Sequence, residues 1–175
     1  FCSVGYLGMI ETLKIAFVAT ILGFIGALCL SSFASKNLMP MYIAFPFRIL
    51  LSATRSLPSL IWAIIFVIVI GFGPLAGVLA MTFYTVGYLG KLQYETFEGM
   101  PSDSLEVSKA MGLSHPATFT SVVIPETGNH LLSQLMFMFE YNVRHGTVIG
   151  IVGAGGIGYY INTYLKFLQY DKVLA

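Results

Sequence analysis

Uncharged runs divide the chain into segments that are long enough to cross a membrane. Residues 15–35 carry no charge, and about 20 predominantly apolar residues span the ~30 Å of hydrocarbon in a bilayer. Residues 56–90 are also uncharged but too many for one helix, and two glycines and a proline interrupt them at residues 71–74. The pattern predicts spanning helices at about residues 15–35, 47–70 and 75–94, with a bend at Pro58 in the second.

The chain becomes polar after the third of these runs. Residues 91–126 hold seven of the 17 charged residues (9 basic and 8 acidic). A further apolar run follows at about residues 131–152 and carries Glu140 and Arg144 inside it. We therefore expect a polar loop at residues 102–125 between two spanning helices.

Composition indicates a membrane protein built from helices. Hydrophobic residues make up 57% of the chain and charged residues 10%, whereas soluble domains carry about 25% charged residues. The net charge of +1 lacks the basic excess of a nucleic-acid-binding protein. We expect an all-α, multi-pass transmembrane bundle that forms a single domain over residues 1–175 and lacks the terminal helices of a longer bundle.

Basic residues predict the orientation of this bundle, because Lys and Arg concentrate in cytoplasmic loops. If the loop around Lys36 and Arg48 lies inside the cell, Lys91 and Lys109 also lie inside. The uncharged turn at residues 71–74 then lies outside. The polar loop is expected on the cytoplasmic side.

The polar loop has the residues of two short helices. Ser102 or Asp103 is expected to cap the first, with Glu106 completing a pattern that resembles a capping box. Gly112 is suited to end this helix and Pro116 to begin the second. The second helix would show one apolar face, formed by Phe119, Val122 and Val123. Two short helices that meet at a glycine make a compact docking element.

The same loop resembles the signature cytoplasmic loop of ABC importer permeases. The positions that match are Glu106, Ala110, Gly112 and Pro125, while Val107 replaces the usual alanine. The resemblance implies that the loop inserts into a cleft on an ATP-binding subunit and transmits its closure to the membrane helices. The alternative is an ordinary solvated loop with helical propensity.

Other segments are similar to permeases of the phosphonate and phosphite import family, namely residues 55–66, 71–77, 87–92 and 140–144. The resemblance implies a type I, methionine-permease-like fold in a subunit that imports phosphonate, phosphite or a related phosphorus oxyanion. Methionine and polar amino acid permeases share the Arg-Ser-x-Pro and Gly-Ala-Gly-Gly-Ile-Gly elements, so a methionine or amino acid importer is the alternative substrate class.

The resemblance also implies an assembly in the inner cell membrane. It contains a second copy of the chain, ATP-binding cassette subunits and an extracellular substrate-binding protein. ATP and Mg²⁺ would be held by the ATPase, since this chain has no Gly-x4-Gly-Lys-Ser/Thr loop and is not expected to be an enzyme or to bind a cofactor. A secondary transporter without an ATPase is a further alternative.

Charged side chains inside the apolar runs are candidate pathway residues. A charge at the centre of a membrane helix costs about 2.5–3.5 kcal/mol on insertion scales and usually faces a bundle interior. Glu140 and Arg144 are four residues apart, so they either pair with each other or line the pathway. An oxyanion favours arginine as its partner, and Arg144 is the first candidate, with Arg55 and Asn142 as weaker ones.

A glycine motif near the end of the chain permits two interpretations. Gly153, Gly155, Gly156 and Gly158 satisfy the spacing of a dinucleotide-binding fingerprint, which would suit a membrane-embedded oxidoreductase. No alternation of strands and helices surrounds the motif. We therefore expect the glycines to permit close approach of helices or backbone near the outer surface. No metal-ligand spacing and no catalytic constellation is apparent.

Overall fold

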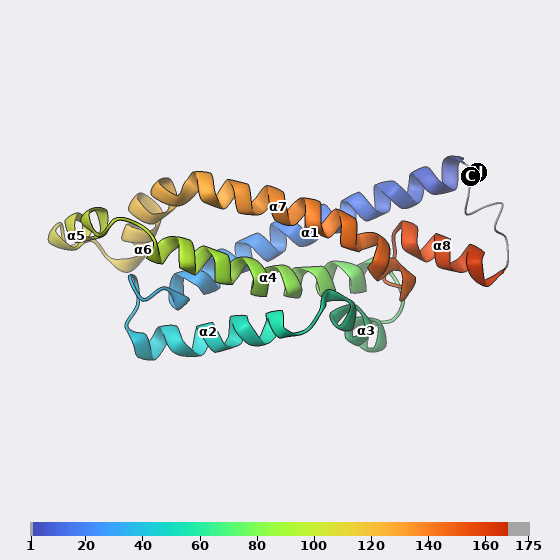
Figure 1. The fold of residues 1–175 in the computed structure, drawn as a ribbon, viewed down its shortest axis with the longest axis horizontal. Coiled ribbons are helices and arrows are strands. Elements are labelled where there is room, and N and C mark those ends of the chain that lie inside the picture. The colour runs from blue at the N-terminus through green and yellow to red at the C-terminus, as the bar shows by residue number, and fades with distance from the viewer. Residues whose placement is uncertain (1, 168–175) are drawn as a thin grey trace.

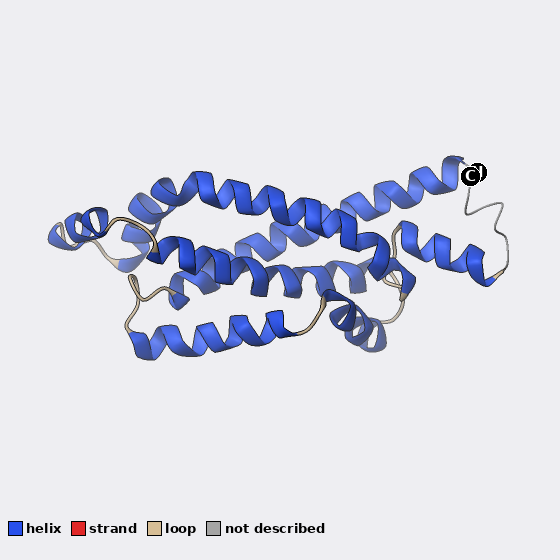
Figure 2. Ribbon diagram, in the orientation of Figure 1, coloured by secondary structure: helices blue, strands red, loops and turns tan. Residues whose placement is uncertain are grey.

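The computed structural model describes residues 2–167, and these residues form helices joined by short loops, without a β-strand (Figure 2). The all-α prediction is confirmed. The helices in chain order are α1 (Cys2–Ala34), α2 (Met41–Ser56), α3 (Ser59–Ile70), α4 (Pro74–Glu98), α5 (Ser102–Ala110), α6 (His115–Thr118), the π-helical turn η1 (Phe119–Val123), α7 (Ile124–Ile151) and α8 (Ile157–Lys166).

Helix α4 is the central element of an elongated bundle and packs against α1, α2, α3 and α7. Helices α5 and α6 lie at one end of the bundle, and α3 and α8 lie at the other (Figure 1). We call these the loop end (residues 35–40 and 99–118) and the turn end (residues 71–73 and 152–156). The loop that carries Lys36 and the helix that carries Lys109 share the loop end, opposite the uncharged turn, as the distribution of basic residues predicts.

Small residues bring α1 and α4 together along their lengths. Ala16, Ala19 and Ala27 of α1 are completely buried. A Cβ atom added to Gly23 would lie 2.5 Å from the side chain of Thr85 on α4, so only glycine fits there. Small residues permit this close approach of helix backbones in membrane proteins.

Helix α1 begins 13 residues before the predicted span at residues 15–35. Glu11 and Lys14 limit the uncharged run, but no proline interrupts the helix before it. The charges therefore mark where the uncharged run begins and not where the helix begins.

The prediction of one continuous helix at residues 47–70 is wrong. The chain forms two helices, α2 and α3, which meet at an angle of 87°. Leu57 is extended, because a residue before proline is excluded from the helical region, and Pro58 then starts α3 as its N-cap. The bend at Pro58 is correctly placed, but it is a break between two helices.

Helices α1 and α4 are each long and apolar enough to cross a membrane, and the bent pair α2 and α3 makes a third span if it counts as one. Helix α7 covers the predicted run at residues 131–152 but begins seven residues earlier. Within the described residues, α7 is not apolar enough to count as a membrane span by length and composition. Its polar side chains are the reason, and they form part of the candidate site.

Candidate functional site

The first helix of the polar loop begins differently from the prediction. Pro101 occupies the N-cap of α5 in an extended conformation, and no side chain caps the helix. Ser102 and Asp103 already belong to the first turn, where their side chains contact each other at 3.3 Å. The capping-box prediction is wrong because the fixed φ angle of proline sets the helix start one residue earlier. Asp103 still suits the positive end of the helix dipole.

The end of α5 follows the prediction at Gly112. Gly112 has a φ angle of +69°, and its backbone N–H donates to the carbonyl of Lys109 at 3.0 Å. The N–H of Leu113 donates to the carbonyl of Ser108 at 3.1 Å. These two bonds are those of a Schellman motif, which closes a helix with a left-handed glycine. Pro116 then lies in the first turn of α6, as expected.

The second short helix is not a separate element. Helix α6 passes through the π-helical turn η1 directly into α7, with Pro125 in the first turn of α7. Phe119 packs edge-on against Phe97 of α4, with ring centroids 5.6 Å apart. Leu105 and Val123 are buried in the same apolar cluster, against which Val122 also packs. The predicted apolar face is confirmed, and it attaches the loop to both α4 and α7.

The opposite side of α5 is exposed. Glu106, Ala110 and Gly112 all face outward, together with Val107 and Met111, which are 57% and 63% exposed. Among the described residues Glu106 has no ion-pair partner. This side of α5 therefore combines an exposed carboxylate with exposed apolar side chains. We call residues 101–118 the knuckle.

Three helices are tied together at the base of the knuckle. The guanidinium of Arg48 on α2 forms an ion pair with Glu98 at the end of α4, and its Nε donates to the carbonyl of Ala34 at 2.8 Å. Glu98 also accepts the backbone N–H of Lys36 at 2.7 Å, and Arg48 lies 4.6 Å from the ring centroid of Tyr94. We call these contacts the loop-end clamp. No local pattern in the sequence connects two charges that are 50 residues apart.

A stripe of exposed polar residues runs along α7. Glu140 and Arg144 form an ion pair on this face, with side chains that are 68% and 74% exposed. The exposed face of α1, by contrast, is almost entirely apolar. Polar side chains on membrane helices usually face a bundle interior or a water-filled cavity. The members of the stripe lie three, four or seven residues apart: Glu126, Asn129, Ser133, Glu140, Arg144 and Thr147.

The other two pathway candidates lie away from this ion pair. Asn142 is 1% exposed, and its amide donates to the hydroxyls of Thr20 at 2.9 Å and Thr85 at 3.0 Å. It therefore connects α7 to α1 and α4 and is not accessible to a solute in this structure. Arg55 is exposed near the end of α2 and lies over the ring of Tyr88 on α4.

The four glycines at the turn end lie in a tightly packed connection between α7 and α8. Gly153, Gly155 and Gly156 have φ angles of 91°, 82° and 75°, and all four are buried. The carbonyl of Gly153 accepts the N–H of Gly73 at 3.0 Å. A Cβ on Gly155 would lie 2.9 Å from the Cα of Pro74. The prediction of close backbone approach is confirmed, and the motif does not join a strand to a helix, as a dinucleotide site requires.

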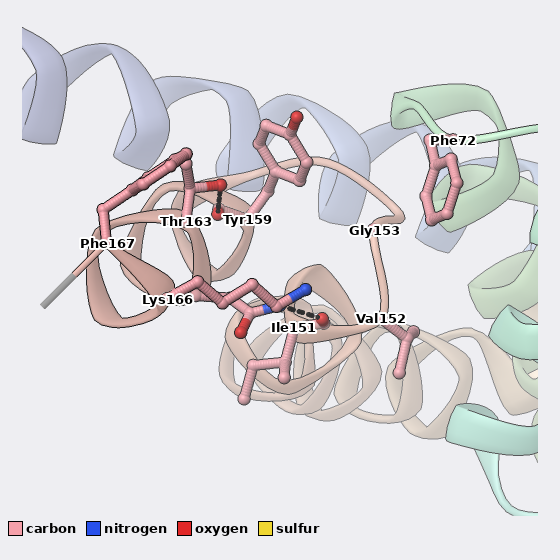
Figure 3. A pocket seen from close by; sticks show the side chains of 9 residues that line it. Phe72, Ile151, Val152, Gly153, Tyr159, Thr163, Lys166 and Phe167 are labelled. Carbon is pink, nitrogen blue, oxygen red and sulfur yellow. Dashed lines mark hydrogen bonds between the residues drawn. The ribbon is translucent and has the colours of Figure 1, made fainter.

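A pocket of about 500 Å³ opens beside this connection (Figure 3). Among the described residues of its lining, which include Tyr159 and Phe72, Lys166 supplies the only charged side chain. The pocket wall is fixed by Asn162, whose amide donates to the carbonyl of Ile151 at 2.7 Å. The turn end therefore has a concave, weakly basic surface.

The bundle and its knuckle define a helical membrane protein with the fold of type I ABC importer permeases. An inward-facing methionine ABC transporter superposes with a TM-score of 0.80, at 24% identity over 91% of this chain and 79% of that one. An amino acid ABC transporter gives a TM-score of 0.76, at 17% identity over 97% of this chain and 80% of that one. The predicted fold class is confirmed.

Residues 19–175 match the family described as the inner membrane component of binding-protein-dependent transport systems, and the chain belongs to this family. A phosphite transport system permease protein of Stutzerimonas stutzeri is 36% identical over 95% of this chain and 61% of its own length. A phosphate-import permease protein of Mycolicibacterium smegmatis is 32% identical over 92% of this chain and 30% of its own length. The resemblance to phosphite and phosphonate permeases is confirmed. The chain spans less than two thirds of the length of these relatives.

Proposed function

We propose that the chain is part of the transmembrane subunit of an ATP-driven importer, which carries phosphonate, phosphite or a related phosphorus oxyanion across the inner cell membrane. The relatives that support this substrate class are a phosphite permease and a phosphate-import permease, each at more than 30% identity over most of the chain. The methionine transporter shares the fold at 24% identity, which supports the architecture and not the cargo.

The observation that carries the proposal is the continuity between the knuckle and the polar stripe. One helical run extends from α6 through η1 and α7, so it joins the base of the knuckle to Glu140 and Arg144. Helix α5, which carries Glu106, packs on this run through Leu105 and Val123, so a displacement of Glu106 by an ATP-binding cassette subunit would move α7 in the membrane interior. ATP and Mg²⁺ belong to that partner subunit.

The exposed polar stripe also supports an assembly with a second copy of the chain. A charged pair that is about two-thirds exposed in one subunit is costly against lipid. Two α7 helices facing each other would enclose a polar pathway between them, with Glu140 and Arg144 on its wall and Arg55 nearby. Asn142 would hold that wall in place from behind, and the turn end would receive the extracellular binding protein.

Purification of the full-length protein tests the proposal. An ATPase subunit is expected to co-purify, and the complex in proteoliposomes is expected to accumulate phosphite, phosphonate or phosphate when the loaded binding protein and ATP are supplied. Glu106→Ala is expected to abolish uptake, while the variant protein still purifies and stays soluble in detergent. Uptake that persists in Glu106→Ala would support a secondary transporter, and uptake of methionine alone would assign the cargo to the amino acid class.

A further inference from the structure

Three tyrosines form a stacked cluster where α4 and α7 meet. The ring centroids of Tyr84 and Tyr141 are 5.5 Å apart, and those of Tyr88 and Tyr141 are 6.4 Å apart, with interplanar angles of 14° and 12°. The hydroxyl of Tyr141 donates to the hydroxyl oxygen of Tyr84 at 3.1 Å. We call these residues the tyrosine cluster. Its members are 53 to 57 residues apart across the two helices, so no sequence motif connects them.

Arg55 of α2 borders this cluster. Its guanidinium carbon lies 5.7 Å from the ring centroid of Tyr88. Arg55 is exposed and makes no ion pair with a carboxylate in the part of the chain that the structure describes. The Tyr88 hydroxyl has no hydrogen-bond partner within residues 2–167. Two donor groups, one of them cationic, are therefore left available beside each other.

The neighbouring cations, unlike Arg55, are each paired with a carboxylate. Arg144 is paired with Glu140, Lys91 with Glu95, and Arg48 with Glu98. Each of these positive charges is offset by a carboxylate on the same helix or on a helix packed against it. In this region of the described structure, the positive charge of Arg55 is not offset by a carboxylate. Arg55 is therefore a better candidate for the oxyanion contact than Arg144, which reverses the order that the sequence suggests.

The cluster lies at mid-depth in the bundle. Tyr88 is 14 residues from the start of α4 and 10 residues from its end, or about 21 Å and about 15 Å along the helix axis. Arg55 directly precedes the break between α2 and α3. In secondary transporters, substrate sites lie near the bilayer midplane beside interrupted helices, and the same placement is available here.

We propose that Arg55 and the tyrosine cluster form the contact site at which the pathway receives its oxyanion, a proposal that rests on the proposed function. A guanidinium presents two parallel N–H donors that match two phosphoryl oxygens, and the Tyr88 hydroxyl donates to a third. The rings give the site an apolar border for the P–H or P–C side of phosphite or phosphonate, which accepts no hydrogen bond. The Glu140–Arg144 pair lines the pathway without providing net positive charge.

Transport by the full complex in proteoliposomes tests the site. Tyr88→Phe removes one hydroxyl and keeps the stacked ring, and it is expected to lower uptake of phosphite about tenfold, as expected for loss of a hydrogen bond to a charged group. Arg55→Gln is expected to lower uptake at least as much, with partial recovery in Arg55→Lys. ATP hydrolysis stimulated by the loaded binding protein is expected to persist in all three. Tyr42→Phe is the matched control, because Tyr42 is 78% exposed near the start of α2.

The outcomes separate this site from the proposed function. If the unaltered complex transports no phosphorus oxyanion, the proposed function fails. If it does, and Tyr88→Phe transports like Tyr42→Phe, the site is refuted even when Arg55→Gln is inactive through misassembly. Replacement of both Glu140 and Arg144 by Gln is expected to change uptake less than Arg55→Gln does, and the reverse order would return the cargo contact to Arg144.

Discussion

The two ends of the bundle both depend on glycine, but in opposite ways. At the turn end the four glycines of residues 153–158 are buried. Neighbouring backbone occupies the space that a side chain would need at Gly155 and Gly158, and neighbouring side chains occupy it at Gly153 and Gly156. At the loop end Gly112 is exposed, and nothing lies within 4 Å of an added Cβ. The turn end is therefore held by close packing around its glycines, whereas the outer side of the knuckle is uncovered.

This difference agrees with a turn end that supplies stability and a loop end that supplies the proposed docking surface. The hydroxyl of Thr12 in α1 accepts the N–H of Ile157 at 2.9 Å, so the turn end connects three helices through short contacts. At the loop end the stabilising contacts stop at the loop-end clamp and the cluster around Leu105. Substitutions at the turn end should thus mainly affect folding, and those on the outer side of the knuckle should mainly affect the proposed coupling.

The largest expected effect on stability is that of Gly158→Ala. A Cβ at this position would overlap the carbonyl oxygen of Thr147, so α7 and α8 must move apart. Overpacking of this kind costs about 3 kcal/mol, and the unfolding midpoint in detergent should fall on the order of 10 °C. Gly128→Ala in α7 is the control, since nothing lies within 4 Å of its added Cβ. A similar midpoint for both variants would show that the turn end is not packed as described.

Loss of the loop-end clamp should have the next largest effect. Arg48→Ala leaves Glu98 without its cation partner at a site where the two side chains are 18% and 24% exposed, and it also removes the bond to Ala34. We expect a loss of about 2 kcal/mol, less than for a fully buried pair. Lys91→Ala is the control, because the Lys91–Glu95 pair is more exposed and should contribute at most about 0.5 kcal/mol. Equal unfolding midpoints for the two variants would contradict the clamp.

The sequence predicts those features of the two ends of the bundle that depend on local chemistry. Apolar run lengths place the long helices. Gly112, Gly153, Gly155 and Gly156 are recognisable because their left-handed backbone favours glycine. The capping box fails for a local reason as well, since Pro101 competes with Ser102 for the N-cap and fixes the start of α5.

The contacts missed from the sequence all connect distant segments. Arg48 and Glu98 are 50 residues apart, and Tyr84 and Tyr141 are 57 residues apart. Such pairings depend on how α2, α4 and α7 pack, which no periodicity along a single helix specifies. For the same reason the sequence could not show that Asn142 is buried by two threonines or that Arg55 is left without a carboxylate.

A smaller effect on stability is expected for Gly112→Ala. The left-handed φ angle of +69° is the only cost, since no neighbour obstructs the new methyl group. This strain is about 1 kcal/mol, and Gly112→Asn should cost less because asparagine tolerates the conformation better. The two variants are compared by thermal unfolding in detergent. An alanine variant as destabilised as Gly158→Ala would mean that the knuckle, too, is held by packing.

The smallest effect on folding, with a large effect on function, is expected for Glu106→Gln. Glu106 is exposed and has no ion-pair partner among the described residues, so the free energy of unfolding of the isolated subunit should stay within about 0.5 kcal/mol of that of the unaltered protein. If an ATPase binds the knuckle through this carboxylate, ATP-driven uptake should nevertheless fall about tenfold or more, because a hydrogen bond to a charged group is lost at the interface.

Asp103→Asn is the control, because it removes a charge from the first turn of the same helix and should leave uptake nearly unchanged. A loss of uptake in both variants would point to the net charge of the knuckle, whereas a loss in neither would place the coupling contact elsewhere. Loss in Glu106→Gln alone, at unchanged stability, would establish that the loop end serves docking and the turn end serves the fold.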